Sequence, residues 1–552
     1  MRLFLSVLIM LTCITKLSIA QNDRSRENIE ITINNARTGV TVNENGGLTV
    51  NVNTRDVNRF KGQGYVLYND FAAKGDGKTD DMEAIAGTHA YANQNNLVVK
   101  ADDKSVYYIG GKNRTAIIRT DTDFGKASFL IDDSDVQNRN ASVFTVSSNL
   151  TSFKPEGINI LVKNQEKIDV SLPGTCLITV TNSNVKRYIR FGPNQNNGSA
   201  QTDIFIADKN GNIDKMAPII WDFDKITDVT ALPIDEKVLT IKGGKFTTIA
   251  NKAESKYNYY SRGIAIRRSN VIVEGLEHRI TGEGDHGAPY GGFINIGDCA
   301  YVTVRNTVLT GHKTYQTIGS AGVDVSMGTY DISINRALNV SFVNCSQTND
   351  INDNRYWGIL GSNYCKNLVY DKCTFSRFDA HMGVANATIK NSTLGHQGIN
   401  AIGSGTFLVE NSTINGRSLI NLRSDYGSTW QGEFIIRDCI LIPYGGRATN
   451  VSLIGGSNSG QHDFGYICYM PERITIENLI IDDSRLPADY KGPAIFADFN
   501  QGMKDESYKE KFHYVTTKEV ILKNVKTKSG KSLVVSENTF MFRDVKVDSS
   551  QQ

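Results

Sequence analysis

One short pattern of alternating apolar and polar residues recurs through the second half of the chain. Copies such as VTVRNTV, VSFVNCS and ATIKNST alternate for several residues and then reach an Asn, Asp or Lys, which small residues commonly follow. Alternation with a period of two predicts a β-strand that buries every second side chain. The residues that end the copies, called marker residues below, are Asn306, Asn344, Lys372, Asn391, Asn411, Asp438, Asn478 and Asn524.

The spacing of the marker residues favours a solenoid of parallel strands. Successive markers are 38, 28, 19, 20, 27, 40 and 46 residues apart, so the shortest repeats are near 20 residues and the longer ones carry inserted loops. Repeats of this kind with few helical segments are typical of stacked coils. An antiparallel sandwich also has many short strands, but it predicts hairpin turns every ~8–12 residues and leaves the fixed marker unexplained. We therefore predict an all-β solenoid whose Asn side chains stack from coil to coil.

A different pattern precedes the repeats. In YVLYNDFAAKGDGKTDDMEAIAGTHAYANQNN, a strand leads through a Gly-rich turn into a helix. Asp80 and Glu83 are three positions apart and match a capping box at the start of that helix. We interpret Asp76 and Asp81 as residues that shape the turn and the helix terminus rather than as catalytic acids.

The stretch DFAAKGDGKTDD resembles the N-terminal signature of the pectate-lyase-like superfamily. The resemblance implies a right-handed parallel β-helix with a short N-terminal helix that caps its open end. The chain departs from the signature further on, where KADDKSVYY stands in place of the usual Pro-x-Gly and strand. The signature carries almost no information about the reaction.

The rest of the chain divides into a leader, an extension and an insertion. Residues 1–20 combine an early Arg2, an apolar run and a small-residue site, which is typical of a signal peptide. A lipoprotein leader that uses Cys13 is the alternative. We expect a β extension at 21–60 and the β-helix at 61–550, with a β-rich insertion around 130–260.

The leader also determines the expected localisation. An exported chain is secreted, periplasmic or held at the cell surface, and no later apolar run reaches the ~20 residues of a membrane helix. The 60 basic and 58 acidic residues give a net charge of +2, which becomes about zero without the two basic residues of the leader. We expect a monomer that binds no nucleic acid.

Seven cysteines remain beyond the leader. Their number is odd and no CxxC pair suggests zinc. Several fall on buried positions of the strand pattern, so we expect most of them to be small core residues, while a disulfide stays open.

Residues at equal distances from the markers should stack about 4.8 Å apart in neighbouring coils. Positions five to nine residues after a marker are rich in basic, aromatic and amide side chains: His312, Lys313, Tyr315, Arg377, His381, His396, Gln397, Asn400 and Arg417. Taken singly, each Arg is equally well explained as a solvated surface charge, and His381 is better explained as a structural residue. Together they predict a binding strip for an extended anionic polymer, because Arg holds carboxylate or sulfate with two hydrogen bonds.

Further residues near the same face extend this strip. Arg355 and Arg423 add positive charge, and Tyr356, Trp357, Tyr426 and Trp430 are placed to stack on sugar rings. The predicted substrate is therefore an acidic polysaccharide.

Two kinds of reaction fit such a substrate. Hydrolysis needs two carboxylates; Asp350, Asp353 and Asp379 are candidates, but the strip lacks the aspartate set of the superfamily's hydrolases. β-Elimination needs a group that neutralises the uronate carboxylate, a base and an acid, for which Arg, Gln, His, Lys and Tyr suffice. The strip favours a polysaccharide lyase; a polygalacturonase-like hydrolase and a non-catalytic glycan-binding protein are the alternatives.

The predicted roles follow from the residue types. His381 or His396 is the base, Tyr315 or His312 donates the proton, and Arg377 with Gln397 holds the carboxylate. The residues expected to hold neighbouring sugars are Lys313, Arg355, Asn400, Arg417 and Arg423. No cofactor is required by this scheme, although Asp379, which could also orient His381, is a candidate ligand for Ca²⁺.

The segments RFDAH and YWGILGSNYCKN resemble parts of bacterial β-helical glycosaminoglycan lyases that act on chondroitin-type chains. This likeness covers residues 260–440. It implies the same reaction class, β-elimination, on a uronic-acid-containing glycan.

Overall fold

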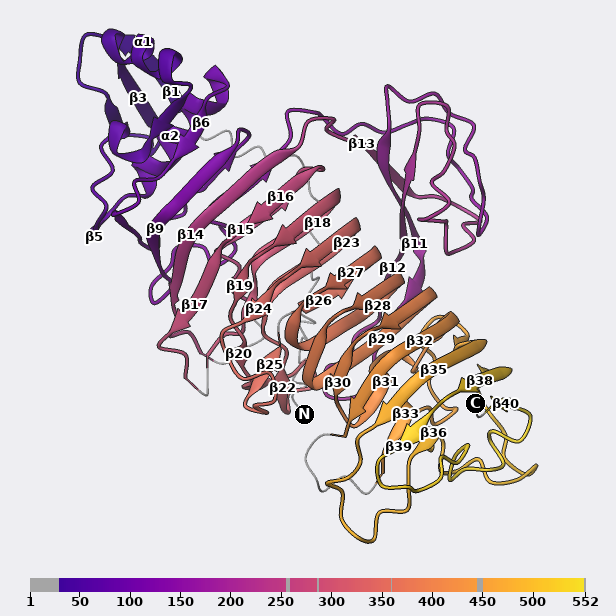
Figure 1. The fold of residues 1–552 in the computed structure, drawn as a ribbon. Coiled ribbons are helices and arrows are strands. Elements are labelled where there is room, and N and C mark those ends of the chain that lie inside the picture. The colour runs from indigo at the N-terminus through magenta and orange to yellow at the C-terminus, as the bar shows by residue number, and fades with distance from the viewer. Residues whose placement is uncertain (1–28, 255–258, 285–286, 359, 444–449, 551–552) are drawn as a thin grey trace, which may run out of the picture.

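The computed structural model describes residues 29–254, 259–284, 287–358, 360–443 and 450–550. The predicted leader at 1–20 lies outside these ranges. The described chain is a right-handed parallel β-helix, in which the strands of successive coils lie side by side along one long axis (Figure 1). The predicted fold class is confirmed.

Strands from each coil lie on three faces of the solenoid. The first face leads to the marker residues and contains β4 (Tyr65–Leu67), β6 (Val98–Lys100), β16 (Val271–Glu274), β27 (Lys366–Asp371), β38 (Glu519–Lys523) and β40 (Lys546–Ser550). The second contains β5 (Asp76–Asp80), β7 (Val106–Ile109), β17 (Glu277–Thr281), β19 (Val308–Leu309), β24 (Ser346–Gln347), β30 (Thr413–Asn415) and β39 (Lys526–Thr527). The third contains β8 (Ala116–Ile118), β10 (Phe144–Ser147), β15 (Ile264–Arg267), β26 (Leu360–Asn363), β31 (Ser418–Leu422), β33 (Ser452–Gly455) and β36 (Ala494–Phe496).

Longer strands bend round the corners and belong to more than one face. They are β9 (Thr122–Asp132), β14 (Leu239–Ile249), β18 (Gly291–Arg305), β23 (Tyr330–Val343), β28 (Thr374–Lys390), β29 (Thr393–Glu410), β32 (Trp430–Ile442) and β35 (Arg473–Ile481). Their inward side chains form one continuous apolar core along the solenoid. This core is what the alternating pattern predicts.

The marker residues form the corner between the first and second faces. All eight have a positive φ, between 47° and 56°, which is the left-handed conformation that Asn tolerates better than most residues. Their side chains stack: Asn344 donates to Asn306 Oδ1 at 2.7 Å, and Asn524 donates to Asn478 Oδ1 at 2.9 Å. The predicted Asn stacking is confirmed.

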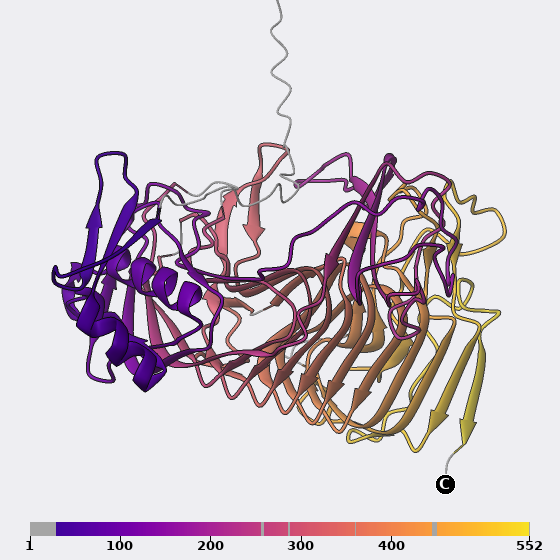
Figure 2. The ribbon, with the colours of Figure 1, turned by 90° about the horizontal axis from the view of Figure 1, so that it is seen from above.

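Helix α2 (Met82–Asn95) lies at the N-terminal end of the solenoid and covers its first coils (Figures 1 and 2). Asp76 and Asp81 shape the preceding turn, as predicted: the carboxylate of Asp81 accepts the backbone N–H groups of Lys74 and Gly75 at 2.6 and 3.0 Å. The predicted capping box is wrong. Glu83 pairs with Lys112 Nζ at 2.6 Å instead of bonding back to the helix terminus.

Two β-rich segments lie outside the solenoid. Strands β1 (Ile29–Asn34), β2 (Gly39–Val42) and β3 (Leu48–Asn53) form a small sheet, and helix α1 (Thr54–Gln63), which the sequence pattern did not predict, follows it. The insertion contains the antiparallel strands β11 (Cys176–Arg187), β12 (Ser199–Ala207) and β13 (Asp228–Pro233). It packs beside the coils of the second half of the chain (Figure 1).

Shorter elements project from the coils. They are β20 (His312–Lys313), which pairs with β25 (Tyr356–Gly358), the hairpin β21 (Tyr315–Ile318) and β22 (Asp324–Met327), the pair β34 (Cys468–Tyr469) and β37 (Tyr514–Val515), and the 3₁₀ turns η1 (Tyr68–Phe71) and η2 (Ser424–Tyr426). The hairpin rises from the same side of the solenoid as the insertion (Figure 2).

The seven cysteines of the described chain are buried and free. They pack as small core residues, as predicted. Among the described residues, no helix is long and apolar enough to cross a membrane.

Substitution at a marker residue tests the corner. Asn391→Ala should lower the free energy of unfolding by about 1–3 kcal/mol, because alanine is strained at positive φ and the bond to Asp371 Oδ1 is lost. Asn391→Gly keeps the backbone conformation and should lose less. Urea unfolding followed by circular dichroism measures both, and equal losses would show that left-handed strain contributes nothing.

Candidate functional site

The predicted strip lies where the coils turn from the second face to the third. Its residues form two clusters on this side of the solenoid. Register pairs join Ile332 to Leu360 and Ser362 to Ala380, so Asp331 and Arg377 occupy equivalent positions two coils apart. That separation is about 10 Å at the usual strand spacing. The clusters are therefore neighbours, but they differ in burial and in charge.

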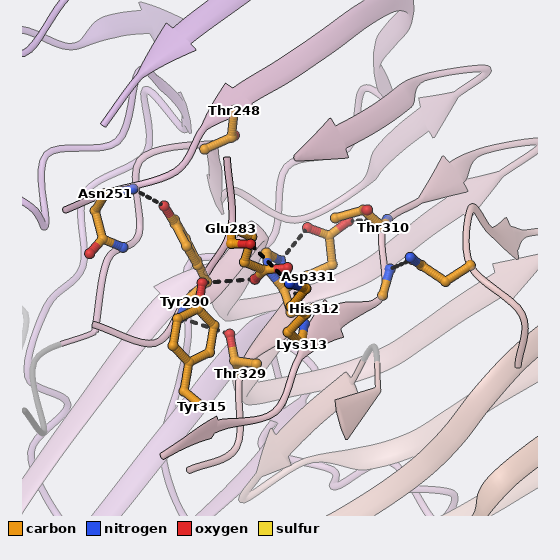
Figure 3. A network of polar contacts seen from close by, with 12 residues as sticks. Thr248, Asn251, Glu283, Tyr290, Thr310, His312, Lys313, Tyr315, Thr329 and Asp331 are labelled. Atoms are coloured by element: carbon orange, nitrogen blue, oxygen red, sulfur yellow. Dashed lines mark hydrogen bonds and ion pairs between the residues drawn. The ribbon is translucent and has the colours of Figure 1, made fainter. Parts of the chain in front are cut away.

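The His312 cluster consists of His278, Glu283, His312, Tyr315 and Asp331, of which Figure 3 labels all but His278. His312 lies between two carboxylates, with Nδ1 3.0 Å from Glu283 Oε1 and Nε2 3.2 Å from Asp331 Oδ1. The same Asp331 oxygen lies 2.7 Å from Nδ1 of His278. The hydroxyl of Tyr315 donates to Glu283 Oε1 at 2.9 Å. Strand β17, the loop after it, β20, β21 and β23 are thus joined through one set of buried charges.

Burial determines what this cluster can do. His312 is 1% exposed and Asp331 is fully buried. Burial opposes a charged ring, but the hydrogen bonds to Asp331 and Glu283 outweigh it and raise the pKa of His312 to about 9. Burial also raises the pKa of Tyr315 well above its ordinary value. In this geometry His312 is a cation that ties hairpin β21–β22 to the coils, and its role as a proton donor stays a prediction.

The Arg377 cluster consists of Arg190, Arg377, Asp379, His381, Arg423 and Asp425. Asp379 is fully buried; it binds Arg377 NH2 through Oδ2 at 2.7 Å and Arg423 NH1 through both oxygens, at 2.9 and 2.8 Å. Arg423 also pairs with Asp425 at 2.7 Å. Burial opposes ionisation of Asp379, yet the two guanidinium groups lower its pKa to about 2. Asp379 is therefore a fixed anion that holds both Arg side chains in place.

His381 lies at the open edge of this cluster. Its side chain and that of Asp425 are each 18% exposed, and so is that of Arg190, which the insertion supplies. Nδ1 of His381 lies 2.9 Å from Asn363 Oδ1, whereas Nε2 lies 3.9 Å from Asp425 Oδ2, too far for a hydrogen bond. Burial and the neighbouring Arg423 lower the pKa of His381 to about 4. The ring is thus neutral at pH 7, with Nδ1–H donated to Asn363 and the Nε2 lone pair unprotonated.

The remaining predicted residues take separate positions. The backbone carbonyl of Ile351 lies 3.0 Å from His396 Nδ1, and the amide of Gln397 lies 3.2 Å from Nε2. Arg417 is exposed, Arg355 is 75% exposed and pairs with Asp353, and Lys313 donates to the carbonyl of Glu283.

Counting from the markers misplaced two residues. His396 was expected beside Arg377, but the register shifts between Phe375 and Arg377, so Gly398 pairs with Arg377 and His396 lies in the bulge before it. Asn400 pairs with Asp379 rather than with His381 and accepts a hydrogen bond from Asn421 at 2.9 Å. A β-bulge adds residues to one strand only, so a constant offset fails after it.

The expected stacking role of Trp430 is wrong. Its side chain is fully buried and donates to the carbonyl of Gly405 at 2.9 Å. Tyr426 is also buried, with its ring 5.4 Å from that of His381. Trp357 is half-buried. The guanidinium carbon of Arg377 lies over its ring, 4.9 Å from the ring centroid.

Sequence reasoning missed His278, Glu283, Asp331, Arg190 and Asp425. Asp331 carried a usable signal, because it stands one residue before the buried strand residue Ile332, as Arg377 stands before Phe378. Arg190 lies in the insertion and Asp425 in η2, so only the fold brings them to this site.

Two of the three carboxylates considered for hydrolysis, Asp353 and Asp379, are held as anions. Hydrogen bonds from Arg355 lower the pKa of Asp353 to about 2, and Asp379 is held similarly by its two Arg partners. Asp350 accepts a backbone N–H from Asn352 within a turn. Neither Asp353 nor Asp379 is protonated at neutral pH, as a general acid must be. Within the described residues, no group of three His, Cys, Asp or Glu has an arrangement suited to a metal ion.

Comparison with known proteins gives limited matches. No family model matches the chain. A capsule KL64-specific depolymerase of Klebsiella phage P510 is 29% identical over 100 residues, which are 16% of this chain and 10% of that protein. The chain thus matches about a tenth of that relative's length.

Solved structures resemble most of the chain at low identity. The tailspike gp61 of Pseudomonas phage phi297 superposes with a TM-score of 0.53 at 12% identity, covering 86% of this chain and 83% of that one. The gp54 tailspike of Acinetobacter baumannii bacteriophage AP22 gives a TM-score of 0.45 at 11% identity, covering 92% and 81%. The likeness to the first structure supports the fold.

Removing one buried charge tests the His312 cluster. Asp331→Asn should lower the free energy of unfolding by about 3–5 kcal/mol, because it leaves a buried imidazolium with one fewer anionic partner. Asp353→Asn removes a carboxylate from an exposed pair and should change stability little. Urea unfolding of both variants measures the two changes in the free energy of unfolding. Equally small losses would contradict the conclusion that charge interactions stabilise the His312 cluster.

Proposed function

We propose that this protein is a polysaccharide lyase that cleaves a uronic-acid-containing glycan by β-elimination at the Arg377 cluster. The observation that carries the proposal is the state of His381. A neutral imidazole, held by Asn363 and partly open to solvent, directs an unprotonated Nε2 into a site rich in guanidinium groups. A base beside fixed cations is what proton abstraction next to a carboxylate requires.

The elimination can be written for these residues. Nε2 of His381 removes the C5 proton of the uronate, the electron pair forms the C4=C5 bond, and the C4–O4 bond breaks. The departing oxygen takes a proton from solvent at the open edge of the cluster, where the side chains of His381 and Asp425 are each 18% exposed. Arg190 and Arg423 neutralise the uronate carboxylate, because both are partly exposed beside the base.

Other members of the strip position this machinery. Asp379 fixes Arg377 and Arg423 and does not itself act as a base, because its pKa of about 2 makes it a weak one. Arg355 and Arg417, both exposed, hold neighbouring sugars. In this proposal the chain is exported and acts as a monomer on an acidic polysaccharide, without a required cofactor.

The comparisons and the resemblance support a glycan as substrate. The matched relative is a depolymerase specific for a capsule, although the match covers a tenth of it. The pectate-lyase-like signature belongs to a superfamily that contains lyases. A polygalacturonase-like hydrolase is less well supported, because Asp353 and Asp379 lack the proton that its acid must supply. A glycan-binding protein without activity is the outcome if no product forms.

Loss of the base tests the proposal. His381→Ala should lower kcat by about 10²–10⁴-fold, the usual contribution of a general base. Product formation is followed by the ultraviolet absorbance of the C4=C5 uronate with a panel of glycosaminoglycans, pectins and alginate. His396→Ala should cost far less, because both ring nitrogens of His396 already have protein partners. His513, which is 71% exposed, supplies the control His513→Ala.

New reducing ends without that absorbance would identify a hydrolase. Binding without any product would identify a glycan-binding protein. A large loss in His396→Ala and none in His381→Ala would move the base to His396.

The pH dependence of the reaction supplies an independent test. The pKa of His381 lies at about 4, below its ordinary value, so the base is unprotonated above that pH. Activity should be retained as the pH falls from 7 and lost as it passes through about 4. The measurement is kcat/KM against pH for the wild type. An acidic limb near the ordinary histidine pKa of about 6.5 would contradict the assignment.

A further inference from the structure

A small open cavity lies between the insertion and the solenoid. The insertion supplies Tyr188 and Trp221, and the coils supply the opposite side. The lining residues that matter here are Tyr188, Trp221, Ser404, Gln431, Tyr466 and Tyr469. None of them belongs to the strip described above.

Aromatic rings form much of the cavity wall. The rings of Trp221 and Tyr466 are 6.0 Å apart, and those of Tyr188 and Tyr466 are 5.2 Å apart. Trp221 is half-buried and lines the cavity, and the guanidinium of Arg187 lies 4.7 Å from the centroid of its ring. Such surfaces stack on the C–H faces of sugar rings.

Polar groups accompany the rings. Gln431 accepts a hydrogen bond from Lys163 Nζ at 2.8 Å, which brings a cation from the insertion to the cavity. Ser404 lies beside Gln431 in register on the neighbouring coil, and Thr429 also lines the wall. Amide, hydroxyl and ammonium groups beside aromatic rings suit a hydroxylated, acidic ligand.

Glycine residues keep the cavity and its wall open. Gly383 has a φ of 61°, and a Cβ there would come 2.3 Å from the hydroxyl of Tyr188. A Cβ at Gly403 would come 1.8 Å from the carbonyl of Val384. A larger side chain at Gly383 would therefore displace Tyr188.

The cavity adjoins the Arg377 cluster. Gly383, which lines it, follows His381 by two residues on β28, a distance of about 7 Å along a strand. The ring of Tyr188 lies 5.8 Å from that of Tyr426, which in turn lies 5.4 Å from His381. Two sugar units of one glycan chain span such a distance.

We propose that this cavity is a sugar-binding subsite, in which the insertion and the solenoid together hold a pyranose ring of an acidic glycan beside the unit bound at His381. This inference rests on the proposed function, because the sugar at the subsite belongs to the same glycan chain that is cleaved at His381. Trp221 and Tyr466 contact the face of the ring, and Gln431, Ser404 and Lys163 bind its hydroxyl and carboxylate groups. The insertion thereby selects longer substrates.

The experiment measures binding with turnover blocked. In a His381→Ala background, isothermal titration calorimetry measures the affinity for di- and hexasaccharides of chondroitin and of polygalacturonate. Trp221→Ala removes an aromatic wall, and Ser404→Phe fills the cavity without removing a packed side chain. Each should weaken hexasaccharide binding by about tenfold, the effect of one aromatic contact, and disaccharide binding less. Tyr301→Ala, at an aromatic residue that is 39% exposed and does not line the cavity, is the control.

The outcomes separate this inference from the proposed function. Hexasaccharide affinity that is unchanged in both variants, with unsaturated product formed by the wild type, would overturn the subsite and leave the lyase standing. Affinity that falls in both variants, without product from the wild type, would support the subsite and reject the lyase. Absence of binding by any of these oligosaccharides would overturn the subsite.

Discussion

The structure depends on one local constraint, the left-handed turn that each coil from Asn306 onward makes at its marker residue. The turn bends these coils at the same place, so each lies in register on the one before. Backbone groups that the bend would leave unpaired form hydrogen bonds with the next coil. The stacked side chains of Asn306, Asn344 and their successors reinforce that register. Because the corner is fixed, variation between coils is confined to the segments after the second face, where loops and bulges are added at little cost to the core.

Both clusters of charged residues arise in that variable region, and their contrast shows how burial sets chemistry. Each combines a histidine with a buried carboxylate. His312 is enclosed by Glu283 and Asp331, so it is held as a cation. His381 has one close partner, the amide of Asn363, and lies near Arg423, so it is held neutral. Two neighbouring clusters thus yield a clamp in one case and a candidate base in the other, because their histidines differ in burial and partners.

The sequence predicted the repeating parts of the molecule better than the irregular ones. Strand alternation and an Asn tolerant of positive φ act locally, so the solenoid and its corners were predictable from them. Offsets from the markers brought Arg377, Asp379 and His381 to the correct side, but they failed for His396 because a bulge precedes Gly398. Alternation alone did not reveal that Trp430 points into the core. Arg190 and Asp425 reach the site through packing between distant segments, which no local pattern encodes.

The insertion makes the site more than a surface of the solenoid. A regular coil offers a flat strip, on which a glycan would be held from one side only. Residues 188–190 cross to that strip, where Tyr188 packs on Tyr426 and Arg190 pairs with Asp425 at 3.2 Å. This contact adds a second wall and a cation that the coils do not supply. Burial and Arg423 lower the pKa of His381 most, and Arg190 lowers it further. The candidate base and the cavity beside it therefore depend on the same packing of insertion against coil.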